Sequence, residues 1–176
     1  MGPPGHNGPV TPGIEREWAP FLAAERPMLE AWLEYHRATL VLKCEGLGAE
    51  RLAEASVPPS DLSLLGLVRH MAEVERNWFQ RVFAGVDAPP HYCSDADPEA
   101  DFDRVDPGRA TQDFETFEAE CAASRAVAAQ AASLDAVDRG GGISLRWIML
   151  HMIEEYARHN GHADLLRERI DGATGG

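Results

Sequence analysis

The segment from Ser144 to Gly172 has the periodicity of one long amphipathic helix. Residues four, seven and eleven positions apart share one face of a helix. One such face combines apolar and polar side chains: Ile148, Met152, Glu155, His159, His162 and Leu166. An ionised carboxylate costs several kcal/mol to bury unless it is paired or bound to a metal. The segment therefore predicts a helix whose core face holds a polar site.

Three earlier segments also predict long helices, because their apolar residues recur at helical spacing. We expect these helices at residues 27–45, 62–83 and about 111–134. A shorter helix is expected to begin near Ile14 and to break at Pro27. No segment shows the alternation of apolar and polar residues that is typical of a strand. The expected fold is therefore all-α, a four-helix bundle.

The ends of the chain differ in composition from its middle. Residues 1–13 are rich in proline and glycine, which predicts a flexible leader, and residues 173–176 predict a short tail. We expect a single domain over residues 14–172.

The second predicted helix contains a histidine inside its apolar stripe. The stripe consists of Leu64, Leu67, His70, Met71, Val74 and Trp78. Ser60 or Ser63 is expected to cap this helix, and Ser144 is expected to cap the last one. The charged residues Glu73, Glu75, Arg76 and Arg81 are expected on the flanks or on the solvent side.

Residues 85–110 predict a long loop, because they contain four prolines and several aspartates. The segment is about twice as long as an ordinary connection between two helices of a bundle. Two interpretations remain open: a lid over a functional site, or simple disorder.

Composition excludes several classes of function. The net charge of −13 argues against binding to nucleic acid or to an anionic membrane surface. No apolar run approaches the roughly 20 residues of a membrane span. Three widely spaced cysteines without a Cys-x-x-Cys motif imply no disulfide framework, so we expect a reducing, cytoplasmic location. The chain contains neither a phosphate-binding P-loop nor a Gly-x-Ser-x-Gly elbow.

His70, Glu155 and His159 predict a site for a divalent metal. A lone histidine on an apolar face is usually a hydrogen-bonded core residue, but the joint occurrence with a Glu-x-x-x-His pair favours ligands that converge from facing helices. Three protein ligands leave a position for water or substrate, as in catalytic zinc sites. Nickel, iron and manganese could use the same donors. His162 could be a ligand, a partner of a ligand or a substrate contact, and His151 a partner of a ligand or a polar core residue.

Two segments of the chain, Leu62–Arg76 and His151–Glu168, resemble the DinB/YfiT-like superfamily, and within it the DUF664 branch of mycothiol-transferase-like proteins. The resemblance implies a four-helix bundle of the up-down-down-up type, often a homodimer, with a divalent metal held by three residues. The superfamily usually has His-x-x-x-His on its last helix, whereas this chain has Glu155 and His159, as the mycothiol-dependent maleylpyruvate isomerases do. Carried over, the ligands are His70, Glu155 and His159. The single lysine fits the high-GC actinobacterial origin that this branch implies.

The resemblance also implies a chemistry. A metal-bound thiol cofactor such as mycothiol would lose its proton and attack a small electrophilic substrate, in a transfer or an isomerisation. Two alternatives stay open, because a fold alone does not fix a function. One is a metal-dependent hydrolase, cyclase or non-haem iron enzyme of a biosynthetic pathway. The other is a non-catalytic, stress-related bundle in which the metal only holds helices together.

Overall fold

The structure is a computed structural model that describes residues 15–174, so the predicted leader lies outside the described residues. Within that range it contains helices and two isolated bridges but no strand, which confirms the all-α prediction. The long helical elements are α1 (Glu25–Cys44), α3 (Leu64–Glu75), its π-helical continuation η1 (Arg76–Phe83), α5 (Ala110–Gln130) and α6 (Leu145–Asp171). The short ones are α2 (Ala49–Leu52), α4 (Ala100–Asp103) and the 3-10 turn η2 (Pro107–Arg109).

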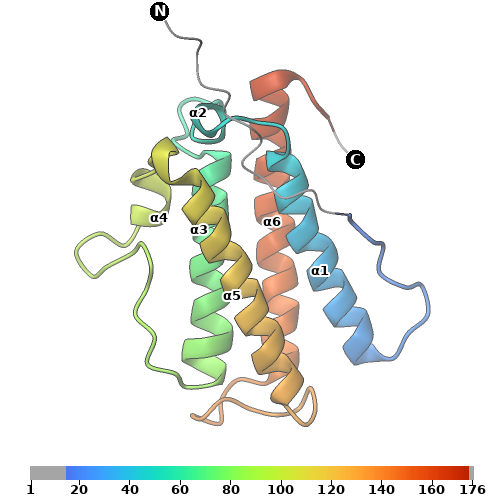
Figure 1. Cartoon of the computed structure of the whole chain (residues 1–176). Coiled ribbons are helices and arrows are strands. Elements are labelled where there is room, and N and C mark those ends of the chain that lie inside the picture. The colour runs from blue at the N-terminus through green and yellow to red at the C-terminus, as the bar shows by residue number, and fades with distance from the viewer. Residues whose placement is uncertain (1–14, 175–176) are drawn as a thin grey trace, which may run out of the picture.

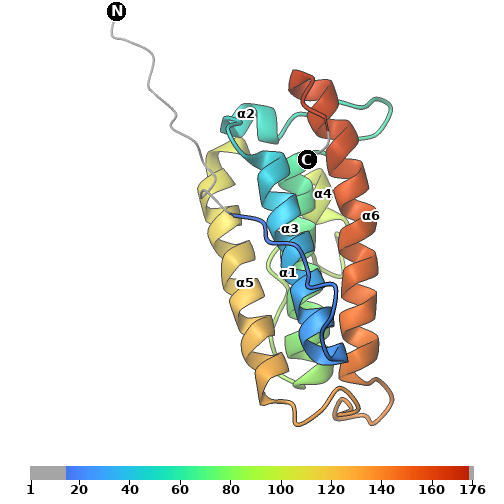
Figure 2. The ribbon, with the colours of Figure 1, turned by 90° about the vertical axis from the view of Figure 1, so that its right-hand side faces the viewer.

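The four long helices lie side by side (Figure 1). In this view α1 and α6 run upward along the chain, whereas α3 with η1 and α5 run downward. The most extensive packing joins α1 to α6 and α3 to α5, and α3 also packs on α6. A turned view shows α1 and α6 adjacent along most of their length (Figure 2). None of the described helices is both long enough and apolar enough to cross a membrane.

Local sequence signals fix where α3 and α6 begin and where α6 ends. The hydroxyl of Ser63 accepts a hydrogen bond from the Gly66 amide at 3.1 Å, and Ser144 accepts one from Trp147 at 3.2 Å. Gly172 ends α6 in the left-handed conformation with φ +79°. The predicted caps Ser63 and Ser144 are therefore confirmed. Because a helix start determines which way each later side chain points, these caps help to orient the polar residues of α3 and α6.

The helix expected from Ile14 to Pro27 is absent from the described part of that segment. Residues 15–24 are not helical, and α1 begins at Glu25. Pro27 lies in the first turn of α1, where a missing backbone N–H removes no helical hydrogen bond. Pro27 therefore lies at the start of the long helix, as expected, but the described residues before α1 form no helix for it to break.

Glu75 was expected on a flank or on the solvent side, but it is fully buried. Its carboxylate accepts two hydrogen bonds of 2.7 Å from the Arg37 guanidinium and one of 2.7 Å from the Tyr156 hydroxyl. Burial opposes the charge on Arg37, yet the Glu75 carboxylate raises the pKa of this guanidinium well above its usual value. Glu75 can be buried because Arg37 of α1 and Tyr156 of α6 compensate its charge. The sequence around Glu75 does not reveal these partners.

The connection between η1 and α5 returns along the outer side of α3 (Figure 1). Its short helix α4 packs on α3. The guanidinium of Arg69 is buried beneath it and donates hydrogen bonds to the carbonyl oxygens of Ala100, at 2.7 Å, and of Arg104. These contacts attach the segment to the helix that carries His70.

Candidate metal centre

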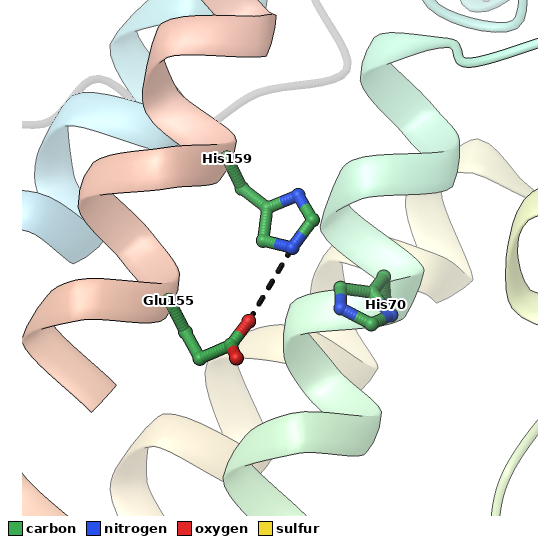
Figure 3. A group of neighbouring side chains, drawn as sticks. All are labelled: His70, Glu155 and His159. Carbon is green, nitrogen blue, oxygen red and sulfur yellow. Dashed lines mark ion pairs between the residues drawn. The ribbon is translucent and has the colours of Figure 1, made fainter. Parts of the chain in front are cut away.

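Two facing helices bring the three predicted ligands together. His70 projects from α3, and Glu155 and His159 project from α6 one turn apart (Figure 3). One potential ligand atom from each of the three side chains lies within 4.8 Å of the other two. The side chains are 20%, 21% and 12% exposed, in the order His70, Glu155 and His159. The group is therefore partly desolvated and still accessible to a small molecule.

The spacing of the donors fits a divalent ion. Nε2 of His159 lies 3.4 Å from a carboxylate oxygen of Glu155. Two ligand atoms bound to one zinc ion at ~2.1 Å are about 3–3.5 Å apart. The pair on α6 already has this separation, and a potential ligand atom of His70 lies within 4.8 Å of one on each of them. Two imidazoles and one carboxylate suit zinc, and also iron, nickel or manganese.

Asp101 and Phe102 of α4 hold the His70 ring. The Nδ1 atom of His70 lies 2.8 Å from Oδ2 of Asp101, and the Phe102 ring stacks on the imidazole at 4.4 Å between centroids. Burial opposes the charge on Asp101, but its hydrogen bond with His70 keeps the pKa of the carboxyl below its usual value. Histidines that bind metals commonly donate their second nitrogen to such a carboxylate. The arrangement leaves Nε2 of His70 available on the side of α6.

Sequence reasoning missed Asp101. The only signal is the general richness in aspartate of residues 85–110, and nothing in the sequence distinguishes Asp101 from the other carboxylates of that segment.

His159 is held in the neutral form that a metal requires. Burial lowers its pKa to about 4, with a further contribution from the nearby His70 and His162 imidazoles. A neutral imidazole can donate its lone pair to a cation without first losing a proton. Nδ1 of His159 and Nδ1 of His162 are both buried and have no hydrogen-bond partner among the described residues.

Along α6, His151 precedes the pair formed by Glu155 and His159, and His162 follows it. The His162 ring is 5.4 Å from the His159 ring, and Nε2 of His151 is 3.6 Å from Oε1 of Glu155. Neither belongs to the group formed by His70, Glu155 and His159. His151 forms a second, more exposed group of potential ligands with Glu154 and Glu155.

Comparison with known proteins identifies the family. A family model described as mycothiol S-transferase matches residues 28–172, a range that includes the three candidate ligands and all four long helices except the first turn of α1. Searches of curated proteins and of solved structures gave no match. The match agrees with the resemblance seen in the sequence and covers more than half of the chain. The chain belongs to the mycothiol S-transferase family.

Proposed function

We propose that this protein is a divalent-metal-dependent transferase that joins the sulfur of a mycothiol-type thiol to a small electrophilic substrate. His70, Glu155 and His159 would hold the metal, with zinc as the first candidate. The observation that carries the proposal is the convergence of two imidazoles and a carboxylate on one accessible group, in a chain of the mycothiol S-transferase family. The three free cysteines support a reducing, cytoplasmic location.

Each residue of the group has a distinct part in this proposal. A bound divalent cation would supply Lewis acidity, which lowers the pKa of a coordinated thiol toward neutrality. Three protein ligands leave at least one position open for that thiol. Asp101 fixes the orientation of His70, and burial keeps His159 unprotonated. The partial exposure of Glu155 lets the substrate approach from solvent.

The protein's own cysteines do not supply the nucleophile. Burial raises the pKa of Cys44 to about 12 and that of Cys93 to about 11, and it also raises the pKa of Cys121. All three therefore stay protonated at neutral pH and react slowly with electrophiles. The sulfur that reacts is then that of the small thiol. The reaction forms one sulfur–carbon bond. When a halide is displaced, the halide leaves and the thiol proton goes to solvent. When an epoxide is opened or an activated double bond is attacked, the alkoxide oxygen or the carbanion takes up a proton, so the thiol proton is retained in the product.

The proposal is tested by metal analysis and thiol turnover on the same purified samples. Mycothiol is offered with monobromobimane or a chlorinated arene to the wild type, to His159→Ala and to Glu154→Gln. Glu154 is a matched control because it neighbours Glu155 on α6 but is 53% exposed. We expect His159→Ala to lose the metal and at least about 100-fold in turnover, since a ligand is removed, while circular dichroism stays unchanged. Glu154→Gln should keep both metal and turnover.

Other outcomes would contradict the proposal and separate the alternatives. Bound iron with oxygen sensitivity and no thiol turnover would favour a non-haem iron enzyme. Thiol turnover that persists in the metal-free protein would remove the metal from the mechanism. Loss of the helical fold together with the metal, without thiol turnover in any sample, would favour a purely structural ion.

A further inference from the structure

An aromatic group lies next to the candidate metal centre and has no part in holding it. It consists of Trp78 of η1 and of Trp147 and His151 of α6. The Trp78 and Trp147 rings are 5.2 Å apart, and the His151 ring stacks on Trp147 at 4.9 Å and meets Trp78 edge-on at 4.8 Å. Trp147 is nevertheless 47% exposed, so much of this indole faces solvent.

The aromatic group and the metal centre form one continuous row along α6. Trp147, His151, Glu155 and His159 follow one another at intervals of four residues, which places them on one side of the helix. Trp147 lies two turns, about 12 Å, from Glu155. A ligand with one end at the metal and the other on Trp147 would therefore be an extended small molecule.

The π-helical segment η1 brings Trp78 onto the same side as His70. In a regular α-helix a residue eight positions further on is rotated by about 80° from the first. The wider i→i+5 turns of η1 advance each residue by a smaller angle, so Trp78 stays closer to the face of His70. Its ring then contacts α6 at Trp147 and His151. Such π-helical turns are frequent at functional sites.

The imidazole and the indole nitrogens of these rings keep unused hydrogen-bonding capacity. His151 lies 3.7 Å from Glu154 and 3.6 Å from Glu155, distances too long for hydrogen bonds. Across residues 15–174 no hydrogen bond engages the indole nitrogen of Trp78 or Trp147. The group therefore offers flat apolar faces that are bordered by the His151 imidazole and by two indole N–H groups.

We infer that this aromatic group binds the sugar part of the thiol, an assignment that rests on the proposed function. Mycothiol carries its acylated cysteine on a neutral pseudodisaccharide, whose rings have apolar C–H faces and a rim of hydroxyls. The faces stack on Trp147 and Trp78, and the hydroxyls bond to His151 and to the indole N–H groups. A neutral polyol is also not repelled by a chain of net charge −13. An apolar aromatic electrophile would use the indole faces but would make no hydrogen bond to the imidazole or to the indole N–H groups.

Two thiols of different length test the inference. Conjugation of one electrophile is measured with mycothiol and with N-acetylcysteine, which has the same reactive end but no rings. We expect Trp147→Ala to lower kcat/KM for mycothiol by about tenfold, mainly through KM, because a stacking surface is lost. The value for N-acetylcysteine should stay unchanged, as should the metal content. Leu150→Ala is the matched control, since Leu150 is 52% exposed on the same helix, and Trp147→Phe should restore part of the loss.

A binding measurement separates this inference from the proposed function. The thiol-free pseudodisaccharide is titrated calorimetrically into the wild type and into Trp147→Ala, and binding is expected to the wild type only. Equal loss of kcat/KM for both thiols, or no binding of the pseudodisaccharide while thiol turnover is intact, would overturn the inference alone. Binding of the pseudodisaccharide without thiol turnover would contradict the proposed function instead.

Discussion

The contact between Asp101 and His70 shows how a residue outside the ligand set can govern it. His70 is the only candidate ligand on α3, so its ring must point at α6 without help from a neighbouring ligand. The hydrogen bond from Nδ1 to Asp101 and the stacking of Phe102 restrict both the tautomer and the rotation of the ring. We therefore treat Asp101 as a positioning residue for His70.

Replacing Asp101 by asparagine should weaken metal binding without unfolding the protein. The amide keeps the size of the side chain but removes the charge that favours a metal-bound imidazole. We expect a 10- to 100-fold lower affinity, about the range seen when such partners are changed, measured by competition with a coloured chelator. Asp95→Asn serves as the control, because Asp95 is exposed in the same segment. An affinity equal to that of the wild type would show that Phe102 alone positions the ring.

Residue positions on one helix could be predicted from the sequence, whereas partners from distant segments could not. Helical spacing alone places Glu155 and His159 one turn apart on one side of α6. Asp101 reaches His70 from 31 positions away, through a loop without a regular period. The buried Glu75 is paired with Arg37, which comes from another helix. Local pattern contains no information on either contact, so both were missed.

The short helix α4 is the element that connects the long loop to the metal centre. Arg69, which neighbours His70 in sequence, donates to backbone carbonyls at both ends of α4, and its guanidinium lies 4.4 Å over the Tyr92 ring. The structure gives Arg69 a role in attaching the segment that carries Asp101.

Replacing Arg69 by alanine should loosen the segment around α4 more than the bundle itself. Two carbonyl oxygens and the Tyr92 ring lose their partner, and a buried cation is removed together with its contacts. We expect faster hydrogen exchange across residues 92–104, with little change in α1 and α5, measured by mass spectrometry. Metal affinity should fall as well, because Asp101 is no longer held. Arg81→Ala, at an exposed position of η1, is the control; uniform exchange throughout the chain would indicate global destabilisation instead.

The existence and type of the long helices were predictable because their apolar residues recur at helical spacing, and α3 and α6 also carry serine caps at their starts. Ser144 and Gly172 delimit α6 as expected. The prediction of a short helix between Ile14 and Pro27 was wrong, whereas the long helix expected from Pro27 starts within two residues of that position, at Glu25. The π-helical turns of η1 have no sequence period of their own and could not be foreseen.

Across the whole molecule, the candidate metal centre spans the boundary between two packed helix pairs. The structure packs α1 most extensively on α6 and α3 most extensively on α5, and the three candidate ligands come from α3 and α6. A bound ion would therefore tie one pair to the other. The hydrophobic core is built separately, from buried residues of all four long helices that do not include the ligands. The fold should then exist without the metal, and the metal should add to its stability.

Removal of the metal should lower the melting temperature but leave a folded protein. A ligand that binds only the native state, present at 100 times its dissociation constant, stabilises it by about 2.7 kcal/mol. For a chain of this length that corresponds to roughly 5–10 °C. We expect this shift by calorimetry when zinc is added to the chelated wild type, no shift for His159→Ala and the full shift for Glu154→Gln. Far-ultraviolet circular dichroism of the chelated protein should remain helical. If the chelated protein were instead unfolded, the ion would be part of the core, and the separation of folding from chemistry argued above would be wrong.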